Sequence, residues 1–460
     1  MFNRNAMGNT RAKLLAGAVL MTLGLTAAGA AMSTNVGGGG ATLPAGGYVG
    51  WNFTTSGATS TVFSSNVSGK PGATVDSTSL IGNWASTSGN SVSYCQTGSG
   101  GGKKIFDHSD GTATWGGAGQ ACTGSASATT GFGADTSIVD PHFVGSDAPM
   151  SQSEFTWFGN GTNLGNKATQ YGQPSQFPAI VGSVAIAFNN PDASSLDLSD
   201  AGICRIFSGQ VTDWTNLVSS DFHTLPSTFP LPSRALKVAY RGDGSGTTFS
   251  LANHLSTVCG TIGGKYFQAD QSFATVVAQF GLPAGSIAGT GNPGVVAAIS
   301  NNAGAIGYAE SANLQHTTVS ANTHVANVNG KNPYSDLASS YTFTTIVVDN
   351  VINGWNTTGT LGTPKLQALS PAAPVPGCML MVNPTAYANG IGTSYPILAV
   401  SNLIFNEKGN GTDVTAVRDL MSYTYSATRR VGATLIGTGT GYAFVTAPTA
   451  NTKVSTCING

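Results

Sequence analysis

Charged residues are scarce in this 460-residue chain: Asp, Glu, Lys and Arg make up 8% of it, and the formal net charge is -1. The chain therefore offers no basic stripe to neutralise phosphates, which argues against a nucleic-acid partner. The six histidines include no His-Glu-x-x-His and no close pair, and the six cysteines include no Cys-x-x-Cys. These absences argue against a metal site or a thiol redox centre, so we expect no metal and no cofactor.

Long hydrophobic runs are absent after the first thirty-one residues. The chain begins with the basic residues Arg4, Arg11 and Lys13, an apolar run over 14–25 and a small-residue stretch over 27–31. This order is typical of a secretory signal peptide, and the apolar run is short for a membrane span. We predict that residues 1–31 are a cleaved signal peptide, that no membrane span remains, and that the protein is periplasmic or secreted.

Small residues are abundant instead. The chain holds 62 glycines, yet 40% of its residues are hydrophobic, and its length allows two or more domains with sizeable cores. The segment 107–140 is dominated by Gly, Ala, Ser and Thr, which indicates an exposed loop or insertion. An even number of cysteines behind a signal peptide indicates disulfides, but six cysteines allow fifteen pairings and the sequence alone does not choose among them.

The most informative stretch spans residues 238–249 and reads Val-Ala-Tyr-Arg-Gly-Asp-Gly-Ser-Gly-Thr-Thr-Phe. It predicts a short buried strand, a glycine turn and a helix that Ser245 or Thr247 would cap. The start of a helix leaves backbone N–H groups unpaired and carries partial positive charge, so it can bind an anion. Arg241 adds a guanidinium suited to an oxyanion. The alternative is a capped turn with a surface arginine.

Three other turns are each ambiguous. Residues 36–44 could form a tight turn between a strand and a helix, although their composition favours a linker. The Gly/Ser turn around Ser99 is typical of a flexible loop when taken alone. Asp147 follows a short apolar run and precedes Pro149, as turn aspartates often do.

Apolar and amphipathic segments alternate along the chain. Buried strands are expected over 91–94, 177–189, 304–308 and 395–400, and helices over 198–207, 294–299 and 414–421. Strands that alternate with helices favour an α/β architecture.

Taken together and in order, these motifs resemble a known family. They are Gly-Gly-Gly-Ala-Thr-Leu-Pro (38–44), Gly-Ser-Gly-Gly-Gly-Lys (98–103), Gly-Ser-Asp-Ala-Pro (145–149), Ile-Phe-Ser-Gly-Gln-Val-Thr-Asp-Trp (206–214), Tyr-Arg-Gly-Asp-Gly-Ser-Gly-Thr-Thr (240–248) and Gly-Ala-Ile-Gly-Tyr (304–308). The set resembles the PstS family of phosphate-binding proteins of bacterial ABC transporters. Three features bring the chain nearer to the DING proteins. They are the first motif in this set, Tyr-Pro-Ile-Leu (395–398) before Asn-Leu-Ile-Phe (402–405), and the placement of Cys204 and Cys259.

The resemblance implies a two-lobed α/β fold of the periplasmic-binding-protein type II, with phosphate in the cleft between the lobes. Lobe 1 would hold residues 36–180 and 389–460, and lobe 2 residues 181–388. The implied phosphate contacts are Thr42, Leu43 through its backbone N–H, Ser99, Asp147, Arg241, Ser245, Gly246 and Thr247. Asp243 matches a family acid that steadies the arginine. The implied protein is a monomer that binds inorganic phosphate, with an ABC transporter permease as a candidate partner.

The resemblance also bears on the cysteines. It implies a disulfide between Cys204 and Cys259. We further expect a bond between Cys95 and Cys122, which are near each other across the insertion, and a bond between Cys378 and Cys457, the two cysteines that are then left. The chain departs from the family pattern in the long segment between Ser99 and Asp147. It also lacks the cysteine that DING proteins carry just after Asn-Leu-Ile-Phe, where Asn406 and Glu407 stand.

Phosphate fits these residues better than sulfate does. An ionised Asp147 only accepts hydrogen bonds, so a protonated phosphate can donate to it, whereas sulfate has no proton and is repelled. Two other functions stay open. One is a secreted phosphatase-like hydrolase, although neither Ser99 nor Ser245 lies in a Gly-x-Ser-x-Gly nucleophile motif. The other is an extracellular adhesive or matrix protein, which the low charge and the abundance of Gly, Ser and Thr suggest.

Overall fold

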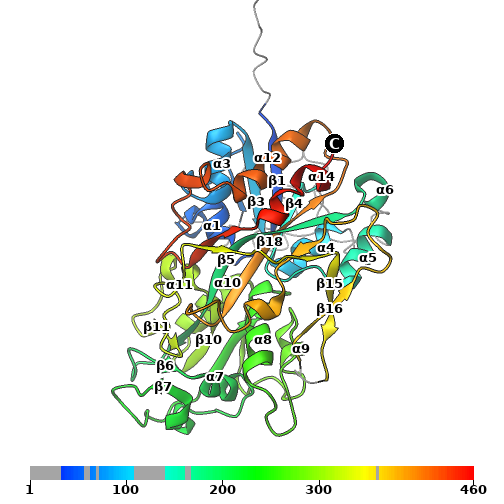
Figure 1. Cartoon of the computed structure of the whole chain (residues 1–460). Coiled ribbons are helices and arrows are strands. Elements are labelled where there is room, and N and C mark those ends of the chain that lie inside the picture. The colour runs from blue at the N-terminus through cyan, green and yellow to red at the C-terminus, as the bar shows by residue number, and fades with distance from the viewer. Residues whose placement is uncertain (1–32, 56–62, 69–71, 108–139, 161–166, 359–361) are drawn as a thin grey trace, which may run out of the picture. The chain divides into compact units, whose positions relative to one another are not determined.

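The longest strand, β5 (Pro174–Asn189), joins two groups of strands into one 12-stranded sheet (Figure 1). All of its residues are buried, as the apolar stretch over 177–189 predicts. Residues 174–183 pair antiparallel with β18 (Leu398–Asn406), and residues 184–188 pair antiparallel with β10 (Ala305–Glu310). The partner strand therefore changes between Ser183 and Val184, close to the predicted boundary at 180/181, which itself stays a prediction.

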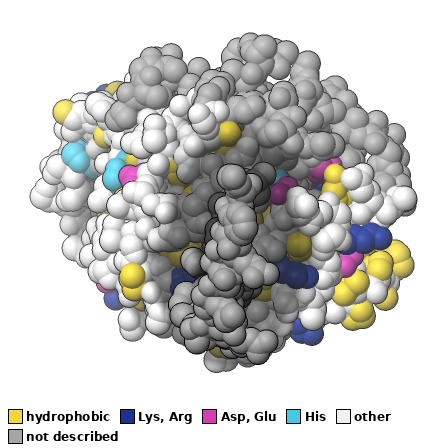
Figure 2. Space-filling model, turned by 90° about the horizontal axis from the view of Figure 1, so that it is seen from above, with side chains coloured by type: hydrophobic (Ala, Val, Ile, Leu, Met, Phe, Trp, Pro, Cys, Tyr) yellow, Lys and Arg dark blue, Asp and Glu magenta, His cyan; other side chains and the backbone are white. Residues whose placement is uncertain are grey.

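The protein is described by a computed structural model, which covers residues 33–55, 63–68, 72–107, 140–160, 167–358 and 362–460. The expected signal peptide over 1–31 and most of the segment 107–140 lie outside the described residues. Within the described ranges, no helix has both the length and the apolar character needed to cross a bilayer. Charged side chains are scattered over the face shown in Figure 2, in keeping with their scarcity in the sequence.

Parallel strands lie on both sides of β5 and β18. On one side the order is β2 (Phe63–Ser65), β3 (Ser91–Gln96), β1 (Asn35–Gly40) and β4 (Phe143–Ser146), with β1 parallel to β3 and β4. On the other side the order is β10, β8 (Lys237–Arg241) and β9 (Ile287–Gly289), all parallel. β19 (Tyr442–Thr446) and β11 (Thr323–Val325) pair with β5, and β13 (Ser340–Thr342) pairs with β19.

Helices follow most of these strands along the chain. The longer ones are α3 (Leu80–Ser88), α4 (Ser99–Phe106), α5 (Gln152–Asn160), α7 (Asp200–Phe207), α8 (Gly246–Val258), α10 (Gly291–Ser300) and α12 (Val414–Tyr425). The expected helices over 198–207, 294–299 and 414–421 are confirmed, and Ser199 caps α7 by accepting from the Gly202 N–H at 3.2 Å. The predicted α/β architecture is therefore correct.

Three local expectations change. Residues 35–40 form β1, so the linker interpretation that their composition favoured is wrong. Ser99 opens α4 rather than lying in a flexible loop. The strand expected over 395–400 begins at Leu398 and extends to Asn406. Its ladder with β5 starts after Pro396, which has no N–H to donate to a neighbouring strand.

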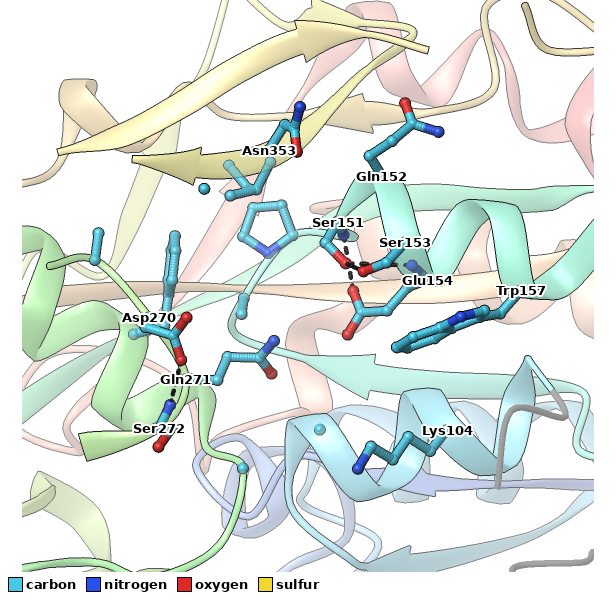
Figure 3. Close-up of a pocket in the computed structure, with 18 residues that line it drawn as sticks. Lys104, Ser151, Gln152, Ser153, Glu154, Trp157, Asp270, Gln271, Ser272 and Asn353 are labelled. Carbon is cyan, nitrogen blue, oxygen red and sulfur yellow. Dashed lines mark hydrogen bonds between the residues drawn. The ribbon is translucent and has the colours of Figure 1, made fainter. Parts of the chain in front are cut away.

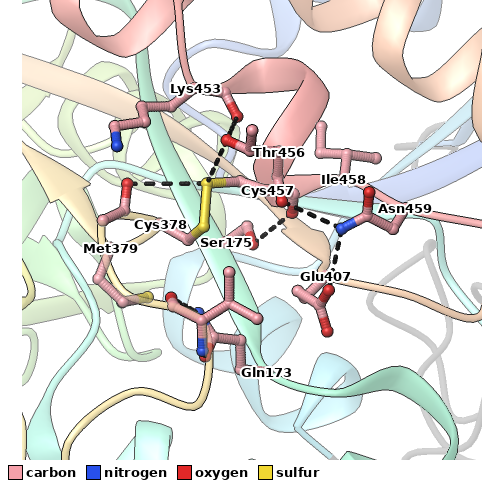
Figure 4. Close-up of a disulfide and its surroundings, with 12 residues drawn as sticks. Gln173, Ser175, Cys378, Met379, Glu407, Lys453, Thr456, Cys457, Ile458 and Asn459 are labelled. Carbon is pink, nitrogen blue, oxygen red and sulfur yellow. Dashed lines mark hydrogen bonds between the residues drawn. A yellow bond between two sulfur atoms is a disulfide. The ribbon is translucent and has the colours of Figure 1, made fainter.

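Two disulfides lie within the described residues, and both match the expected pairing. Cys204 and Cys259 join α7 to the end of α8, with their Cα atoms 5.6 Å apart. Cys378 and Cys457 join the segment before β17 (Leu380–Met381) to α14 (Val454–Cys457) near the C-terminus, with a Cα separation of 5.3 Å (Figure 4). The expected Cys95–Cys122 bond involves Cys122, which lies outside the described residues.

Replacing both Cys378 and Cys457 by serine is expected to lower the free energy of unfolding by about 2–4 kcal/mol, because the bond closes a long loop in the unfolded chain. The two cysteines are 79 residues apart in sequence. The bond also holds the C-terminal segment next to β5, where the Ser175 hydroxyl donates to the Cys457 carbonyl at 2.6 Å (Figure 4). Urea unfolding of the two proteins measures the difference, and equal midpoints would show that the bond adds no stability.

Candidate anion-binding site

The site residues expected from the sequence lie at the carboxyl ends of four strands, three of them in the parallel group of β1, β3 and β4 and the fourth, β8, in the group that runs in the opposite direction. Thr42 and Leu43 follow β1, Ser99 follows β3, Asp147 follows β4, and Arg241 ends β8. In α/β sheets ligands bind outside the carboxyl ends of the strands, because helices begin there and present their free N–H groups. The topology thus brings together segments that lie two hundred residues apart.

Arg241 lies at the centre of the cluster. The residue is 2% exposed, and its Nη1 donates to the Thr42 hydroxyl at 3.1 Å and to the Thr247 hydroxyl at 3.4 Å. Its Nε donates to Asp243 Oδ1 at 2.7 Å, and Nη2 contacts the second carboxylate oxygen of Asp243. Burial alone would raise the pKa of Asp243, but the charge and hydrogen bonds of the guanidinium, together with backbone hydrogen bonds such as that from the Gly291 N–H, hold this pKa below its usual value. In the structure Asp243 therefore orients Arg241, and the surface-arginine interpretation is wrong because Arg241 is buried.

The start of α8 lies against the cluster. Ser245 caps the helix, because its hydroxyl accepts from the Thr248 N–H at 3.1 Å. The next two N–H groups, of Gly246 and Thr247, have no partner within the helix and remain suited to an anion. Gly246 is required for the close approach: a Cβ there would lie 2.5 Å from both the Asp147 Cβ and the Ser99 hydroxyl.

Asp147 and Ser99 form the side of the cluster that lies against the start of α8. The Ser99 hydroxyl accepts from the Asp147 N–H at 3.2 Å and donates to Asp147 Oδ2 at 3.4 Å. The other carboxylate oxygen, Oδ1, is buried and has no hydrogen-bond partner among the described residues. Burial raises the pKa of Asp147 to about 6, although the nearby Ser401 and the charge of Arg241 act in the opposite direction. At neutral pH the site therefore holds an ionised carboxylate with one unused acceptor.

Thr42 and Leu43 complete the set. Thr42 is 4% exposed and lies within hydrogen-bond distance of Arg241, while the Tyr442 hydroxyl donates to the Leu43 carbonyl at 2.6 Å. The Leu43 side chain is fully buried and packs beside Gly182 of β5, where an added Cβ would lie 2.7 Å from Leu43 Cδ2. All eight residues implied by the resemblance thus lie in one cluster around Arg241 and the start of α8.

Asn292 is a member of the cluster that the sequence did not reveal. It is fully buried at the start of α10, and its Nδ2 donates to the Thr42 hydroxyl at 3.2 Å and to the Thr247 hydroxyl at 3.3 Å. Its Oδ1 accepts from the Glu310 N–H at 3.2 Å. The available signal was positional: Asn292 lies at the start of the helix that directly follows β9, and β9 is parallel to β8, the strand that ends at Arg241.

A groove of about 570 Å³ borders the cluster (Figure 3). It lies between α5, the segment 269–272 and the strand β15 (Asn350–Trp355). Gly100 and Gly244 line it and form the wall towards the cluster, where the Gly100 N–H donates to the Gly244 carbonyl at 3.0 Å. Ala148, which follows Asp147, also lines the groove, but none of the eight residues implied by the resemblance does.

Replacing Asp147 by asparagine is expected to stabilise the ligand-free protein at neutral pH by up to about 3 kcal/mol. The folded-state pKa of Asp147 is raised to about 6 from 3.8. Folding is therefore favoured by this group below pH 3.8, and that contribution is lost as the pH rises through 6. Urea unfolding at pH 7.5 and at pH 4 tests this expectation, and an equal difference between the two proteins at both pH values would contradict it.

Comparison with known proteins places the chain in a family. A model described as the PBP superfamily domain matches residues 80–428, so the chain belongs to this superfamily. A phosphate-binding protein from an unknown prokaryotic organism is 28% identical over 309 residues, which cover 64% of this chain and 74% of that protein. A protein named alkaline phosphatase L from Pseudomonas aeruginosa (strain UCBPP-PA14) is 28% identical over 348 residues, which cover 73% of this chain and 76% of that protein.

The fold is similar to that of a solved structure. The crystal structure of a phosphate-binding protein from Stenotrophomonas maltophilia aligns with a TM-score of 0.56 at 23% identity, and the alignment covers 92% of this chain and 94% of that one. The chain thus has the periplasmic-binding-protein fold of type II that its motifs predicted.

Proposed function

We propose that the protein binds inorganic phosphate in the cluster around Arg241, as a periplasmic or secreted solute-binding protein. The observation that carries the proposal is the unused, buried Oδ1 of Asp147. Buried acceptors are normally paired, so this atom calls for a ligand that brings a hydrogen-bond donor. The ligand must also carry negative charge, because Arg241 and the N–H groups of Gly246 and Thr247 lie beside it.

A protonated oxyanion meets both requirements. Phosphate keeps at least one proton throughout the neutral range, so one of its oxygens can donate to Asp147 while the others accept from the arginine and the N–H groups. Sulfate carries no proton in this range and would face the carboxylate with like charge. The relative described as a phosphate-binding protein supports the same ligand.

The proposed organisation has two lobes, residues 36–180 with 389–460 and residues 181–388, and the ligand lies between them. Thr42, Ser99 and Asp147 belong to the first lobe, and Arg241 and Thr247 to the second. Contacts from both sides enclose the ligand and exclude water, which strengthens each charged hydrogen bond. The bound phosphate is either delivered to an ABC transporter permease or retained outside the cell, and a monomer suffices for both.

The similar protein named alkaline phosphatase L raises the question of hydrolysis. We propose binding without hydrolysis. Ser245 is engaged as the cap of α8, and no group of three or more metal-ligating side chains occurs in the part of the chain that the structure describes. The Ser99 hydroxyl donates to Asp147 Oδ2 and accepts from its N–H, a placement that orients the carboxylate.

Titration calorimetry of the purified protein with phosphate and with sulfate tests the proposal. We expect one phosphate per chain and no measurable sulfate binding, together with no release of phosphate from para-nitrophenyl phosphate. Turnover of that ester would favour the hydrolase, and the absence of heat with either anion would favour an adhesive or matrix function.

A further inference from the structure

A buried ion pair lies beside the turn formed by Asp147 and the two residues that follow it, which we call the Asp147 turn. Lys103 is fully buried, and its Nζ lies 2.9 Å from Glu154 Oε2. A buried lysine is costly unless it is paired, and replacing such a pair by apolar residues often leaves a protein equally stable. A role in the site therefore accounts for this pair better than stability alone.

The pair holds the Asp147 turn from two helices. Ser99 and Lys103 are four residues apart on α4, so they face the same side. Ser99 accepts from the N–H of Asp147, and Lys103 donates to the carbonyls of Ala148 at 3.3 Å and Pro149 at 3.4 Å. One face of α4 thus holds Asp147 and the two residues that follow it.

Glu154 connects this arrangement to α5. Its Oε2 accepts from Lys103 and from the Ser151 N–H at 2.7 Å, and the second of these bonds is visible in Figure 3. The turn between β4 and α5 is therefore fixed at both ends. The neighbouring Lys104 is exposed beside the groove, so it shares the sequence context of Lys103 but not its contacts.

Lys103 also contributes charge to the site. The ionisable side chains whose charges act on Asp147 or are affected by it are Arg241, Lys103, Glu310, Tyr48, Tyr94, Tyr387 and Tyr442. Burial raises the pKa of Glu310 above its usual value, and it raises the pKa of the four phenols further above neutral pH, so the phenols stay neutral. Arg241 and Lys103 are the two positive charges in this set, and each faces a carboxylate, Asp243 and Glu154.

We propose that Lys103 and Glu154 are positioning residues that hold the Asp147 turn, and that the charge of Lys103, which Glu154 partly offsets, helps to keep Asp147 ionised at neutral pH, so that the site rejects anions without a proton. The proposal rests on the proposed phosphate function. An ionised Asp147 excludes sulfate, whereas a protonated Asp147 can donate a hydrogen bond to sulfate. The pH at which sulfate begins to compete with phosphate therefore reports the charge of Asp147.

Sulfate competition against labelled phosphate, measured from pH 5 to pH 9, tests the pair. Lys103→Met removes the positive charge and is expected to raise the pH midpoint of competition by roughly one unit, which is about tenfold in the phosphate-to-sulfate ratio at a fixed pH within this range. Glu154→Gln leaves the positive charge of Lys103 unopposed and is expected to lower the midpoint. The matched control Lys104→Met is expected to leave it unchanged.

A purely structural role predicts a different result, namely losses of affinity in both variants that do not depend on pH. Midpoints that move in the same direction for Lys103→Met and Glu154→Gln would overturn the proposal. If Lys103→Met does not fold, Glu154→Gln decides alone: a lower midpoint supports the proposal, and an unchanged one overturns it.

A second measurement needs no ligand. Carboxyl carbon NMR of the ligand-free protein labelled at aspartate, with Asp147→Asn for assignment, follows the titration of Asp147 directly. The titration is expected to move up in Lys103→Met and down in Glu154→Gln, and an unmoved titration overturns the proposal. If the parent protein binds no phosphate, the proposed function fails, but this titration still decides whether the pair controls Asp147.

Discussion

Replacing Arg241 by alanine is expected to weaken phosphate binding by roughly 30-fold to several thousand-fold, which corresponds to about 2–5 kcal/mol. The guanidinium is buried and bonded to Thr42, Thr247 and Asp243, so it is already oriented before an anion arrives. The substitution removes the positive charge and also leaves Asp243 without its counter-charge. The remaining carboxylate then repels the ligand, which adds to the loss.

Calorimetric titration with phosphate measures this effect. Arg429→Ala is a suitable control, because Arg429 is 42% exposed in its side chain and pairs with Asp419 on α12 rather than with a site residue. The control is expected to bind phosphate as tightly as the parent. A folded Arg241→Ala variant with parental affinity would remove Arg241 from the site.

Local patterns predicted much of this site. The stretch Gly-Asp-Gly-Ser-Gly predicted both the turn and the cap of α8, because Ser245 needs only the N–H of Thr248, three residues away. The same holds for the Ser199 cap of α7. Short-range hydrogen bonds of this kind are encoded within one turn of chain, so they can be read from the residues alone.

Contacts between distant segments could not be read in this way. The role of Asn292 depends on Thr42 and Thr247, whose hydroxyls meet only because the fold brings together the segments that follow β1 and β8, two strands of different, oppositely directed groups. In the sequence Lys103 stands next to Lys104 and looks like a solvent-exposed lysine. Its partner Glu154 lies 51 residues further along the chain. A lysine is buried only when such a partner is present, and the partner becomes known only with the fold.

The Ser99 turn could be predicted only in part from local patterns. Its glycines alone favoured a flexible loop, whereas the ordered set of motifs implied a ligand contact. The glycines are instead required for packing: a Cβ on Gly102 would lie 2.5 Å from the Gly40 Cα, and one on Gly98 would lie 2.6 Å from Asp243 Oδ2. Glycine here permits α4 to approach β1 and the arginine pair, which composition alone does not distinguish from flexibility.

Replacing Asp147 by asparagine is expected to reduce the preference for phosphate over sulfate by about 100-fold or more at neutral pH. A like-charge contact in an enclosed site costs several kcal/mol, and every 1.4 kcal/mol is about a tenfold change in affinity. In the parent protein the buried Oδ1 of Asp147 has no protein donor among the described residues, so the ligand must bring the proton, and only phosphate has one. In the variant the amide can turn its N–H₂ towards either anion.

Competition of sulfate against labelled phosphate measures this ratio for both proteins. Asp243→Asn is the matched control, because Asp243 bonds to Arg241 rather than standing as an unpaired acceptor. This control is expected to change both affinities in parallel and to leave their ratio intact. Asp147→Asn should change the ratio itself, mainly through tighter sulfate binding, since the amide removes the repulsion that sulfate meets. If the ratio stays at the parental value in a folded Asp147→Asn protein, Asp147 only shapes the turn before Pro149, and sulfate must be excluded by another group.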